Sequence, residues 1–361
     1  MVDINKILER AIEDKASDVH IIKGLRPIYR INRTLVEVAE SEVVTEKDLD
    51  VIFAYFTLAK EAMKKTFEEE DKLDINFDFN GIRFRVNIAK ASGNYTFTAR
   101  IIRNELPKFE ELGLPEIVKR LSFLPQGLIL VTGKSNSGKT TTLNTLVNEI
   151  NQVENKKIMM LENPIEYVHT PNKSLIVQKE VGNGRDCKTF GEGVNNALRE
   201  DCDFLVIGEI RDKDTIEAAV DMAESGHLVI GTMHTKSASE TVDRALNFFE
   251  AIDQLQMKYM LSSVLKAVVT QRLIVGKKGT LVMVPEIMIV DDAISGLIRK
   301  EKFSKSEIED AIQSRSERGN ISFINSLANL IIKNKISLEQ AKQQLDDKGR
   351  ENLSRLLNQL R

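Results

Sequence analysis

The sequence contains no tryptophan and only two cysteines, Cys187 and Cys202, which do not form a Cys-x-x-Cys pair. A disulfide framework is therefore not expected, and a reduced, cytoplasmic setting is the simplest interpretation. No apolar run reaches the roughly 18 residues that a membrane-spanning helix needs. The N-terminal segment "MVDINKILERAIED" is charged and lacks the apolar core of a signal peptide. Any association with a membrane is therefore expected to come through a partner protein.

An excess of charge of one sign is also missing. The chain has 51 Lys and Arg against 54 Asp and Glu, which gives a formal net charge of -3. No segment has the dense basic block typical of a nucleic-acid-binding arm or a membrane anchor, so direct binding of nucleic acid is not expected. With 42% hydrophobic and 29% charged residues over 361 positions, the composition indicates a soluble globular protein, and the length favours two domains.

Residues 1–103 have the pattern of a small α+β domain. A helix is predicted near residues 3–15, and apolar residues alternate with polar ones from Leu73 to Phe79. Such alternation is typical of half-buried antiparallel strands. Residues 104–125 contain three prolines and Gly113, and we expect them to form a linker with one short helix.

From residue 126 to 361 the pattern changes to continuous apolar runs separated by helical segments. The runs are "GLILVT", "KKIMML", "DFLVIGE" and "HLVIGTMH". Parallel strands covered by helices on both faces are apolar along their whole length, so this pattern predicts an α/β nucleotide-binding domain. A hairpin is expected to turn at residues 277–279, and residues 291–361 are expected to form a helical C-terminal tail.

The segment "GKSNSGKT" fills the pattern G-x-x-x-x-G-K-[ST] between an apolar strand and a helix. In such a loop, backbone N–H groups surround phosphate oxygens, the lysine reaches the β- and γ-phosphates, and the threonine hydroxyl ligates Mg²⁺. We therefore predict a nucleoside triphosphate site. Its candidate residues are Gly133, Ser135, Asn136, Ser137, Gly138, Lys139, Thr140 and Thr141. A chance match in a surface turn is the alternative, which the strand–loop–helix context disfavours.

Acidic residues follow two of the apolar runs. Glu209 ends "DFLVIGE" and is the candidate acid for the metal shell, together with Thr140, because ligands gather at the carboxyl ends of parallel strands. Glu162 and Glu166 follow "KKIMML", and one of them is expected to polarise the attacking water. A solvated loop carboxylate is the alternative for each glutamate.

Two of the four histidines, His227 and His234, flank the run "LVIGTM". Their spacing does not match a zinc site, and no cysteine lies next to them. His234 is either a donor that senses the γ-phosphate or an ordinary structural histidine.

Six segments, taken in order, resemble the type IV pilus retraction ATPases, the PilT-like branch of the secretion ATPase superfamily. The segments are "ASDVH", "GKSNSGKTTTL", "ENPIEYVH", "ALREDCDFLVIGEIRD", "MAESGHLVIGTMHT" and "VDRALNFF". The resemblance covers about residues 3–340. Its ordered segments are far more specific than the phosphate loop alone.

This resemblance implies a homohexamer that hydrolyses ATP with Mg²⁺ to drive pilus retraction and twitching motility. A PAS-like N-terminal domain would pack on the RecA-like ATPase domain of the next subunit, with ATP between them. The resemblance also implies an inner-membrane platform protein as partner, and thus a cytoplasmic protein associated peripherally with the membrane.

The resemblance further implies roles for individual residues. Glu166 matches the catalytic glutamate of the family's acidic box, and Glu209 matches the glutamate of the strand-end box. His227 and His234 match the positions of the histidine box.

Three arginines match family arginines that reach the γ-phosphate from elsewhere in the assembly. They are Arg85 and Arg100 in the N-terminal domain and Arg244 in "VDRAL". Such an arginine contributes about 10³ to 10⁵ in rate. A surface salt bridge is the plain alternative for each of them.

The chain departs from the family pattern at several places. Asn163 stands where an aspartate is usual, and Lys134-Ser135-Asn136 replaces Pro-Thr-Gly in the phosphate loop. In "AISGLIRKEK", Ser295 and Gly296 replace the arginine and asparagine of "AIRNLIRE", a segment linked to retraction. A PilU-like accessory pilus ATPase, another RecA-like hexamer that translocates DNA, and a nucleotide-binding regulator without turnover are therefore the alternatives.

Overall fold

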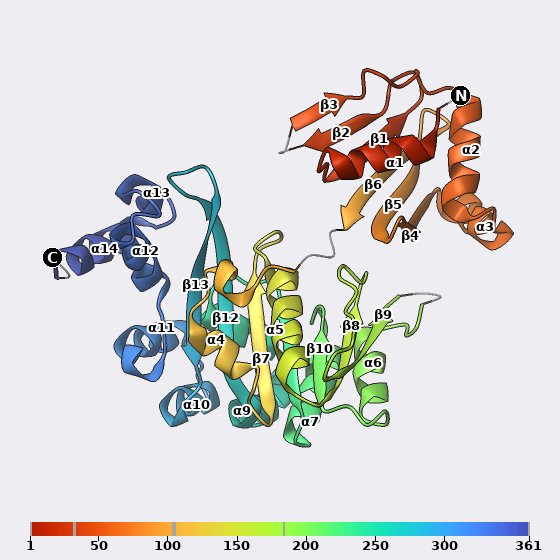
Figure 1. Ribbon diagram of the computed structural model, residues 1–361. Coiled ribbons are helices and arrows are strands. Elements are labelled where there is room, and N and C mark those ends of the chain that lie inside the picture. The colour runs from red at the N-terminus through yellow and green to blue at the C-terminus, as the bar shows by residue number, and fades with distance from the viewer. Residues whose placement is uncertain (1, 32–33, 103–105, 183–184, 360–361) are drawn as a thin grey trace. The chain divides into compact units, whose positions relative to one another are not determined.

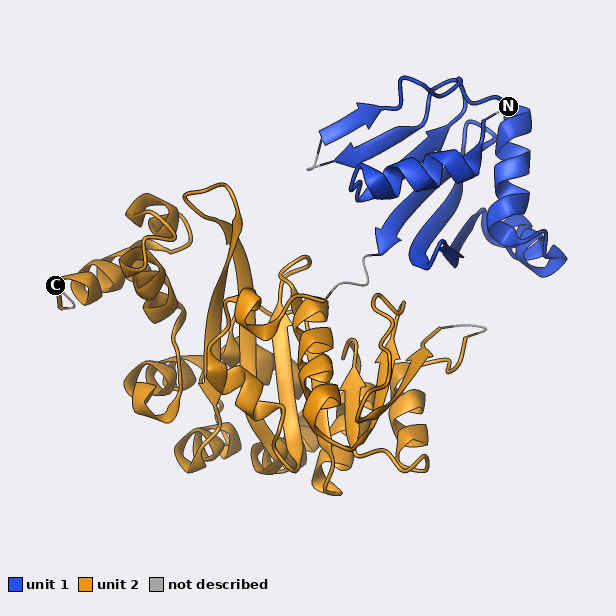
Figure 2. Ribbon diagram, in the orientation of Figure 1, with its two compact units in different colours: residues 1–105 blue, residues 106–361 orange. Residues whose placement is uncertain are grey.

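The computed structural model describes residues 2–31, 34–102, 106–182 and 185–359. The chain divides into two compact units, Met1–Glu105 and Leu106–Arg361 (Figure 2). The predicted boundary between residues 103 and 104 lies outside the described residues. Most of the segment that we expected to be a linker belongs to the second unit, where Phe109, Leu114 and Val118 are buried in the core.

The first unit is built on an antiparallel sheet. Its strands are β1 (Asp18–Ile22), β2 (Ile28–Ile31), β3 (Thr34–Glu37), β4 (Lys72–Phe79), β5 (Ile82–Ala91) and β6 (Asn94–Ile102). They pair in the order β3-β2-β1-β6-β5-β4 (Figure 1). In β5, Phe84, Val86 and Ile88 are buried, whereas Arg83 and Arg85, which alternate with them along the strand, point to the opposite face. The expected alternation of half-buried strands is therefore present.

Three helices cover the apolar face of this sheet. They are α1 (Ile4–Glu13), α2 (Glu46–Thr57) and α3 (Glu61–Glu70). Leu8 of α1, Phe56 of α2 and Phe67 of α3 lie in one hydrophobic core with Phe97 of β6. The first unit is thus an α+β domain with helices on one face of its sheet.

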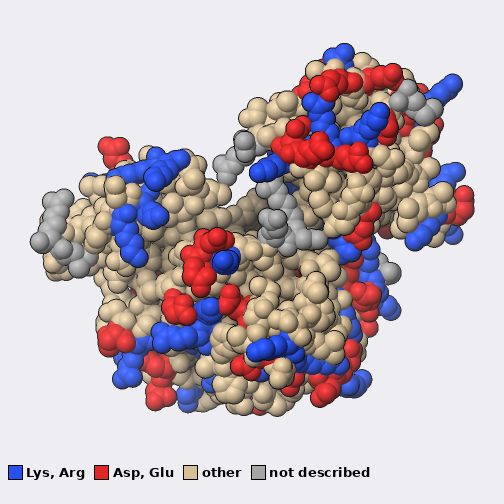
Figure 3. All heavy atoms as spheres, in the orientation of Figure 1, with Lys and Arg blue, Asp and Glu red and all other residues tan. Residues whose placement is uncertain are grey.

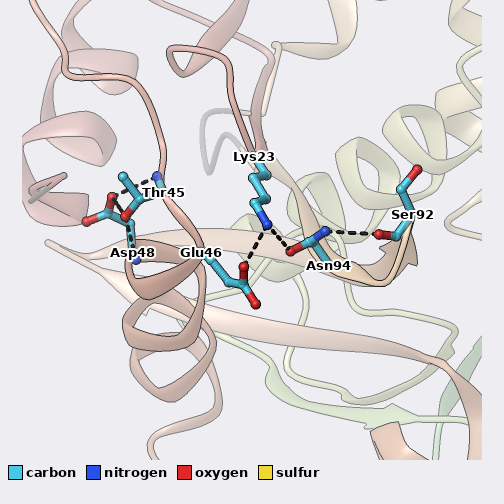
Figure 4. A network of polar contacts seen from close by, with 6 residues as sticks. All are labelled: Lys23, Thr45, Glu46, Asp48, Ser92 and Asn94. Atoms are coloured by element: carbon cyan, nitrogen blue, oxygen red, sulfur yellow. Dashed lines mark hydrogen bonds and ion pairs between the residues drawn. The ribbon is translucent and has the colours of Figure 1, made fainter.

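The N-terminus of α2 is fixed by a polar network that also reaches the turn between β5 and β6 (Figure 4). Thr45 and Asp48 form a capping box, in which the Thr45 N–H donates to the Asp48 carboxylate at 2.9 Å. Lys23 Nζ donates to Glu46 at 2.6 Å and to Asn94 Oδ1 at 3.0 Å. These contacts join α2 to the β5–β6 hairpin.

The second unit contains a seven-stranded, mostly parallel sheet. Its strands are β7 (Gly127–Gly133), β8 (Lys157–Glu162), β9 (Leu175–Glu180), β10 (Phe204–Ile207), β11 (Leu228–Met233), β12 (Leu265–Val275) and β13 (Leu281–Ile289). The order is β13-β12-β7-β11-β10-β8-β9, and only β13 runs antiparallel to its neighbour. The four predicted apolar strands lie next to one another at the centre.

Helices cover both faces of this sheet (Figure 1). The helices are η1 (Phe109–Leu112), α4 (Glu116–Leu121), α5 (Lys139–Val153), α6 (Phe190–Ala197), α7 (Lys213–Glu224), α8 (Ala238–Leu246), α9 (Ala251–Val264), α10 (Asp292–Arg299), α11 (Lys305–Ser314), η2 (Ser316–Arg318), α12 (Phe323–Ile332), α13 (Leu338–Lys342) and α14 (Asp347–Gln359). Residues of α4 and α5 form a core with one face, and residues of α6 to α11 form a core with the other. The predicted RecA-like α/β fold class is confirmed.

The C-terminal helices pack on the far part of the β12–β13 hairpin. Ile274 and Val284 of the hairpin share a core with Phe323, Leu327 and Leu353. Over the described ranges, none of the helices combines the length and the apolar character that crossing a membrane requires. On the face shown in Figure 3, acidic and basic side chains are interspersed over the second unit.

Candidate nucleotide-binding and hydrolysis site

The phosphate loop joins β7 to α5 through residues in the left-handed backbone region. The φ angles are 149° at Gly133, 61° at Asn136 and 91° at Gly138. A Cβ atom on Gly133 would clash with the Ser137 hydroxyl and would lie 2.5 Å from the Gln271 carbonyl oxygen. Because α5 begins directly after the loop, its unpaired N–H groups and positive dipole end face the predicted phosphate position.

Lys139 lies inside this loop. Its Nζ donates to the carbonyl oxygens of Gly133, at 3.0 Å, and Lys134, at 3.2 Å. Burial lowers the pKa of Lys139, and the negative charge of Glu209 opposes that change. The Ser137 hydroxyl is buried and has no hydrogen-bond partner among the described residues. A phosphate oxygen would satisfy Ser137 and would replace the loop carbonyls at the ammonium group.

Thr140 and Thr141 lie in the first turn of α5. A Mg²⁺ ion bound with a nucleotide needs only one or two protein oxygens, because phosphates and waters supply the other ligands. The Thr140 hydroxyl and the Glu209 carboxylate are of the kind that Mg²⁺ prefers. No group of three or more His, Cys, Asp or Glu residues suited to a metal ion occurs in the part of the chain that the structure describes. The donors therefore fit a metal that arrives with the nucleotide.

A cavity of about 590 Å³ borders the loop within the second unit. Gly138 and Thr141 form its edge at the loop, and Pro107, Leu273 and Met283 add apolar surface. Its volume is within the range of small-molecule sites. Thr141 thus faces a space large enough for the nucleoside part of a nucleotide.

Glu209 follows β10 and contacts two other side chains of the site. The Arg211 guanidinium donates to one carboxylate oxygen, and His234 Nε2 lies 3.4 Å from the other. The pKa of His234 is lowered, first by burial and then by the positive charge of Lys139, whereas Glu209 opposes the change. The positive charge of Arg244 also lowers the pKa of His234. The structure therefore brings Lys139, Glu209 and His234 together at the carboxyl edge of the sheet.

The two glutamates after β8 differ in their surroundings. Glu162 is 4% exposed, and its pKa is raised to about 7, mainly by burial and to a smaller extent by the negative charge of Glu166. Glu166 is half-buried in the loop that follows the strand. Its backbone makes a hydrogen bond to Glu162. Glu162 is buried and held by hydrogen bonds, as expected of a residue that fixes the loop. This supports Glu166 as the glutamate that acts on water.

Three residues that contact the loop after β8, or the helix beside it, were not among the predicted site residues. Gln178 of β9 binds Glu162, Asn144 of α5 binds the Thr140 carbonyl oxygen, and His169 binds Asn144. The sequence contains a signal for two of these residues. Asn144 is a polar residue on the buried face of a predicted helix, and His169 is one of only four histidines.

His227 lies away from the phosphate loop within the second unit. It precedes the first residue of β11, and that strand runs parallel to β7, with Leu228 opposite Gly127 and Met233 opposite Thr132. Six residues of strand, about 20 Å, therefore separate it from the edge where His234 lies. Its Nδ1 is 2.9 Å from the Ser225 hydroxyl. The structure thus does not join the two histidines in one site, because a residue before a parallel strand lies at the edge opposite to a residue after it.

The three predicted arginines lie in different elements. Arg244 of α8 is exposed, with its guanidinium 5.9 Å from the ring centre of Phe248. Arg100 Nε donates to Asp18 at 2.9 Å, and Arg85 is opposite Arg100 in the strand register. Burial alone would raise the pKa of Asp18, but hydrogen bonds from Arg100 and from a neighbouring hydroxyl lower it. Their roles toward a γ-phosphate remain predictions.

The strand–loop–helix phosphate site on a helix-covered parallel sheet defines a P-loop nucleoside triphosphatase with a RecA-like domain. The family model of the type II/IV secretion system protein matches residues 1–279, and the chain belongs to this family. The resemblance seen in the sequence is thereby confirmed.

Individual relatives match nearly the whole chain. The "Type IV pilus retractation ATPase PilT" of Pseudomonas aeruginosa is 37% identical over 343 residues, which cover 95% of this chain and 98% of that protein. The type IV pilus ATPase PilU of the same organism is 29% identical, covering 94% and 88%. The crystal structure of the pilus retraction motor PilT with bound ADP has a TM-score of 0.89 and 34% identity, covering 98% of this chain and all of that one.

Proposed function

We propose that this protein is an ATPase motor that hydrolyses ATP to drive type IV pilus retraction, and hence twitching motility. The observation that carries the proposal is the end-to-end similarity to a retraction ATPase, in both sequence and structure. The bound ADP in the similar crystal structure supports nucleotide as ligand. The intact phosphate loop and the acidic residues beside it support turnover over a regulatory role without hydrolysis.

The geometry supports distinct roles for the residues at the carboxyl edge. Lys139 and the loop N–H groups hold the β- and γ-phosphates, and Glu166 orients and polarises the attacking water. Thr140 and Glu209 would hold Mg²⁺, which would supply positive charge to neutralise the phosphates. Glu209 is itself oriented by Arg211 and His234.

The proposal includes a homohexamer with the nucleotide between neighbouring subunits. In such a ring, Arg85, Arg100 and Arg244 stabilise the charge that develops on the γ-phosphate. Because γ-phosphate contacts are lost on hydrolysis, each reaction changes how two subunits are held together. The motor acts on the cytoplasmic side, where a platform protein of the inner membrane receives the movement. The net charge of -3 and the absence of tryptophan favour this partner over single-stranded DNA.

A PilU-like accessory ATPase is the second candidate function. It is favoured by α10, where Ser295 and Gly296 replace residues of the segment linked to retraction. The Ser295 hydroxyl is buried and donates to the Ser262 carbonyl oxygen at 2.8 Å, so this position serves packing here. The higher identity to PilT, 37% against 29%, favours the retraction motor.

Lys139→Ala in cells tests nucleotide use and biological role together. We expect pili to extend but not to retract, as seen by imaging labelled pili, and twitching motility to be lost. Retraction at the wild-type frequency would contradict the proposal. Retraction that is lost only under mechanical load would favour the accessory role.

A further inference from the structure

A buried polar network joins the loop of Glu166 to the helix that follows the phosphate loop. Asn144 of α5 is 1% exposed, and its Nδ2 donates to the Thr140 carbonyl oxygen at 2.9 Å. Its Oδ1 therefore faces His169 Nε2, at 2.7 Å, and must accept a hydrogen bond. The imidazole is thus the neutral Nε2–H tautomer, in keeping with burial, which lowers the pKa of His169 to about 4.

Gln178 of the edge strand β9 holds the same loop from the other side. Its Nε2 donates to Glu162 Oε1 at 2.9 Å and to the Tyr167 carbonyl oxygen at 2.7 Å. Its Oε1 accepts the His169 backbone N–H at 2.9 Å. One amide thereby binds the loop at three positions and uses both of its N–H groups.

These contacts flank Glu166 on both sides in sequence. Glu162, four residues before it, and Tyr167, directly after it, are bound by the same Gln178 amide group. His169 then connects the end of the loop to Asn144, one helical turn from Thr140. The distance from the phosphate-binding helix to Glu166 is therefore fixed by side chains and not by the loop alone.

We propose that Gln178 and Asn144 are positioning residues for ATP hydrolysis, which hold Glu166 at its working distance from the nucleotide. This inference rests on the proposed role of Glu166. Neither residue touches the nucleotide; both act through the loop of residues 162–169.

Neutral amides suit these two positions for an electrostatic reason. Glu166 is a charged side chain that acts on Glu162 from its own loop, whereas α5 and β9 contribute the amides of Asn144 and Gln178. Both amides stabilise the Glu162 carboxylate by hydrogen bonds, against the larger effect of burial. A carboxylate at position 178 would instead add a like charge and remove the donors.

The test compares Gln178→Met, of similar size but without hydrogen-bonding groups, with the wild-type full-length protein. We expect kcat for ATP hydrolysis to fall about 10- to 100-fold, because a small displacement of a reacting group has effects of that size. KM and ADP affinity should stay within about twofold, because the phosphate loop is intact. Gln178→Asn, with a shorter amide, should show the same change. Gln152→Met is the matched control, because Gln152 is exposed in the last turn of α5 and its side-chain oxygen accepts a hydrogen bond from Asn172 at 2.9 Å.

The decisive measurement is Gln178→Met in the Glu166→Gln background. If Gln178 acts through Glu166, the second substitution should not lower the residual rate further. An equal loss in both backgrounds, or loss of ADP binding, would show a general structural role and overturn the inference. If Gln178→Met leaves kcat unchanged while Glu166→Gln strongly lowers it, the inference is overturned but the proposed function is not. A wild-type protein that binds but never hydrolyses ATP would overturn the proposed function itself.

Discussion

His234 Nε2 lies 3.4 Å from Glu209 Oε1, so the residue that follows β11 contacts the carboxylate that follows β10. The other oxygen of Glu209 accepts from Arg211. A hydrogen bond from Arg211 and a close contact with His234 therefore hold one carboxylate near Lys139. Such oriented carboxylates are typical of residues that support a metal ion or its bound waters.

Glu209→Gln should lower kcat for ATP hydrolysis about 10- to 100-fold and should raise the Mg²⁺ concentration needed for half-maximal rate. The amide keeps the size of the side chain but loses the negative charge that acts on Lys139 and that would bind the metal ion in the proposed site. Phosphate release measured across a Mg²⁺ titration checks both effects. Glu224→Gln, in the exposed last turn of α7, is the matched control. An unchanged Mg²⁺ dependence would remove Glu209 from the metal site.

Glu162 and His169 are both buried, and we expect them to have opposite effects on how stability depends on pH. The folded state raises the pKa of Glu162 from 4.5 to about 7, mainly by burial, so folding takes up a proton in this range. Its contribution to the free energy of unfolding therefore falls as the pH rises from 4.5 to 7. Burial lowers the pKa of His169 from 6.5 to about 4, so its contribution rises with pH between 4 and 6.5.

Single substitutions should separate these contributions. Compared with the wild type, Glu162→Gln should make the free energy of unfolding rise more steeply with pH, since the falling contribution of Glu162 is removed and the rising contribution of His169 stays. His169→Gln should make it rise less steeply or fall, by up to about 3 kcal/mol over the range. Urea unfolding at several pH values between 4.5 and 7 measures both slopes. Two variants that change the slope in the same direction would contradict this assignment.

Arg272 of β12 and Glu286 of β13 carry opposite charges that act on each other within the hairpin, and we expect this interaction to stabilise the fold. The Arg272 guanidinium lies 3.7 Å from the ring centre of Phe323 and donates to the Lys236 carbonyl oxygen at 2.8 Å. Burial raises the pKa of Glu286, and the charge of Arg272 opposes this. Arg272→Met should lower the free energy of unfolding by about 2–4 kcal/mol, because Glu286 loses its opposite charge.

Arg355→Met provides the comparison for this variant. Arg355 pairs with Glu351 on exposed α14, and such a surface pair contributes about 0–1 kcal/mol. Denaturant unfolding of both full-length variants, followed by circular dichroism, measures the difference. Equal midpoints for the two would show that the Arg272 pair adds no net stability.

The central strands of the second unit could be predicted because parallel strands buried on both faces are continuous apolar runs. The edge strand β9, "LIVQKE", has polar residues in half of its positions and was not expected. Gln178 was missed with it, because a residue's role in a network depends on a strand pairing that short sequence patterns do not reveal. Lys139 and Thr140 could be found from spacing alone, since their chemistry is local to one loop.

His227 shows what a sequence motif leaves out about position in the sheet. Its distance from His234 in sequence is short, but the direction of β11 places the two histidines at opposite edges of the sheet. The sequence places the two histidines at the two ends of this strand, and the role of His227 stays a prediction. The Arg272–Glu286 pair was missed for another reason, since charges within an apolar hairpin leave no periodic signal.

A subunit-mixing assay tests most directly whether ATP is hydrolysed at a site shared by two subunits. Lys139→Ala and Arg100→Ala proteins, each expected to be inactive alone, are mixed in equal amounts, and phosphate release is measured. If Arg100 acts on a neighbour's nucleotide, the mixture should recover about a quarter of the wild-type rate, because random rings contain interfaces with both residues intact. A mixture as inactive as its two components would contradict the account.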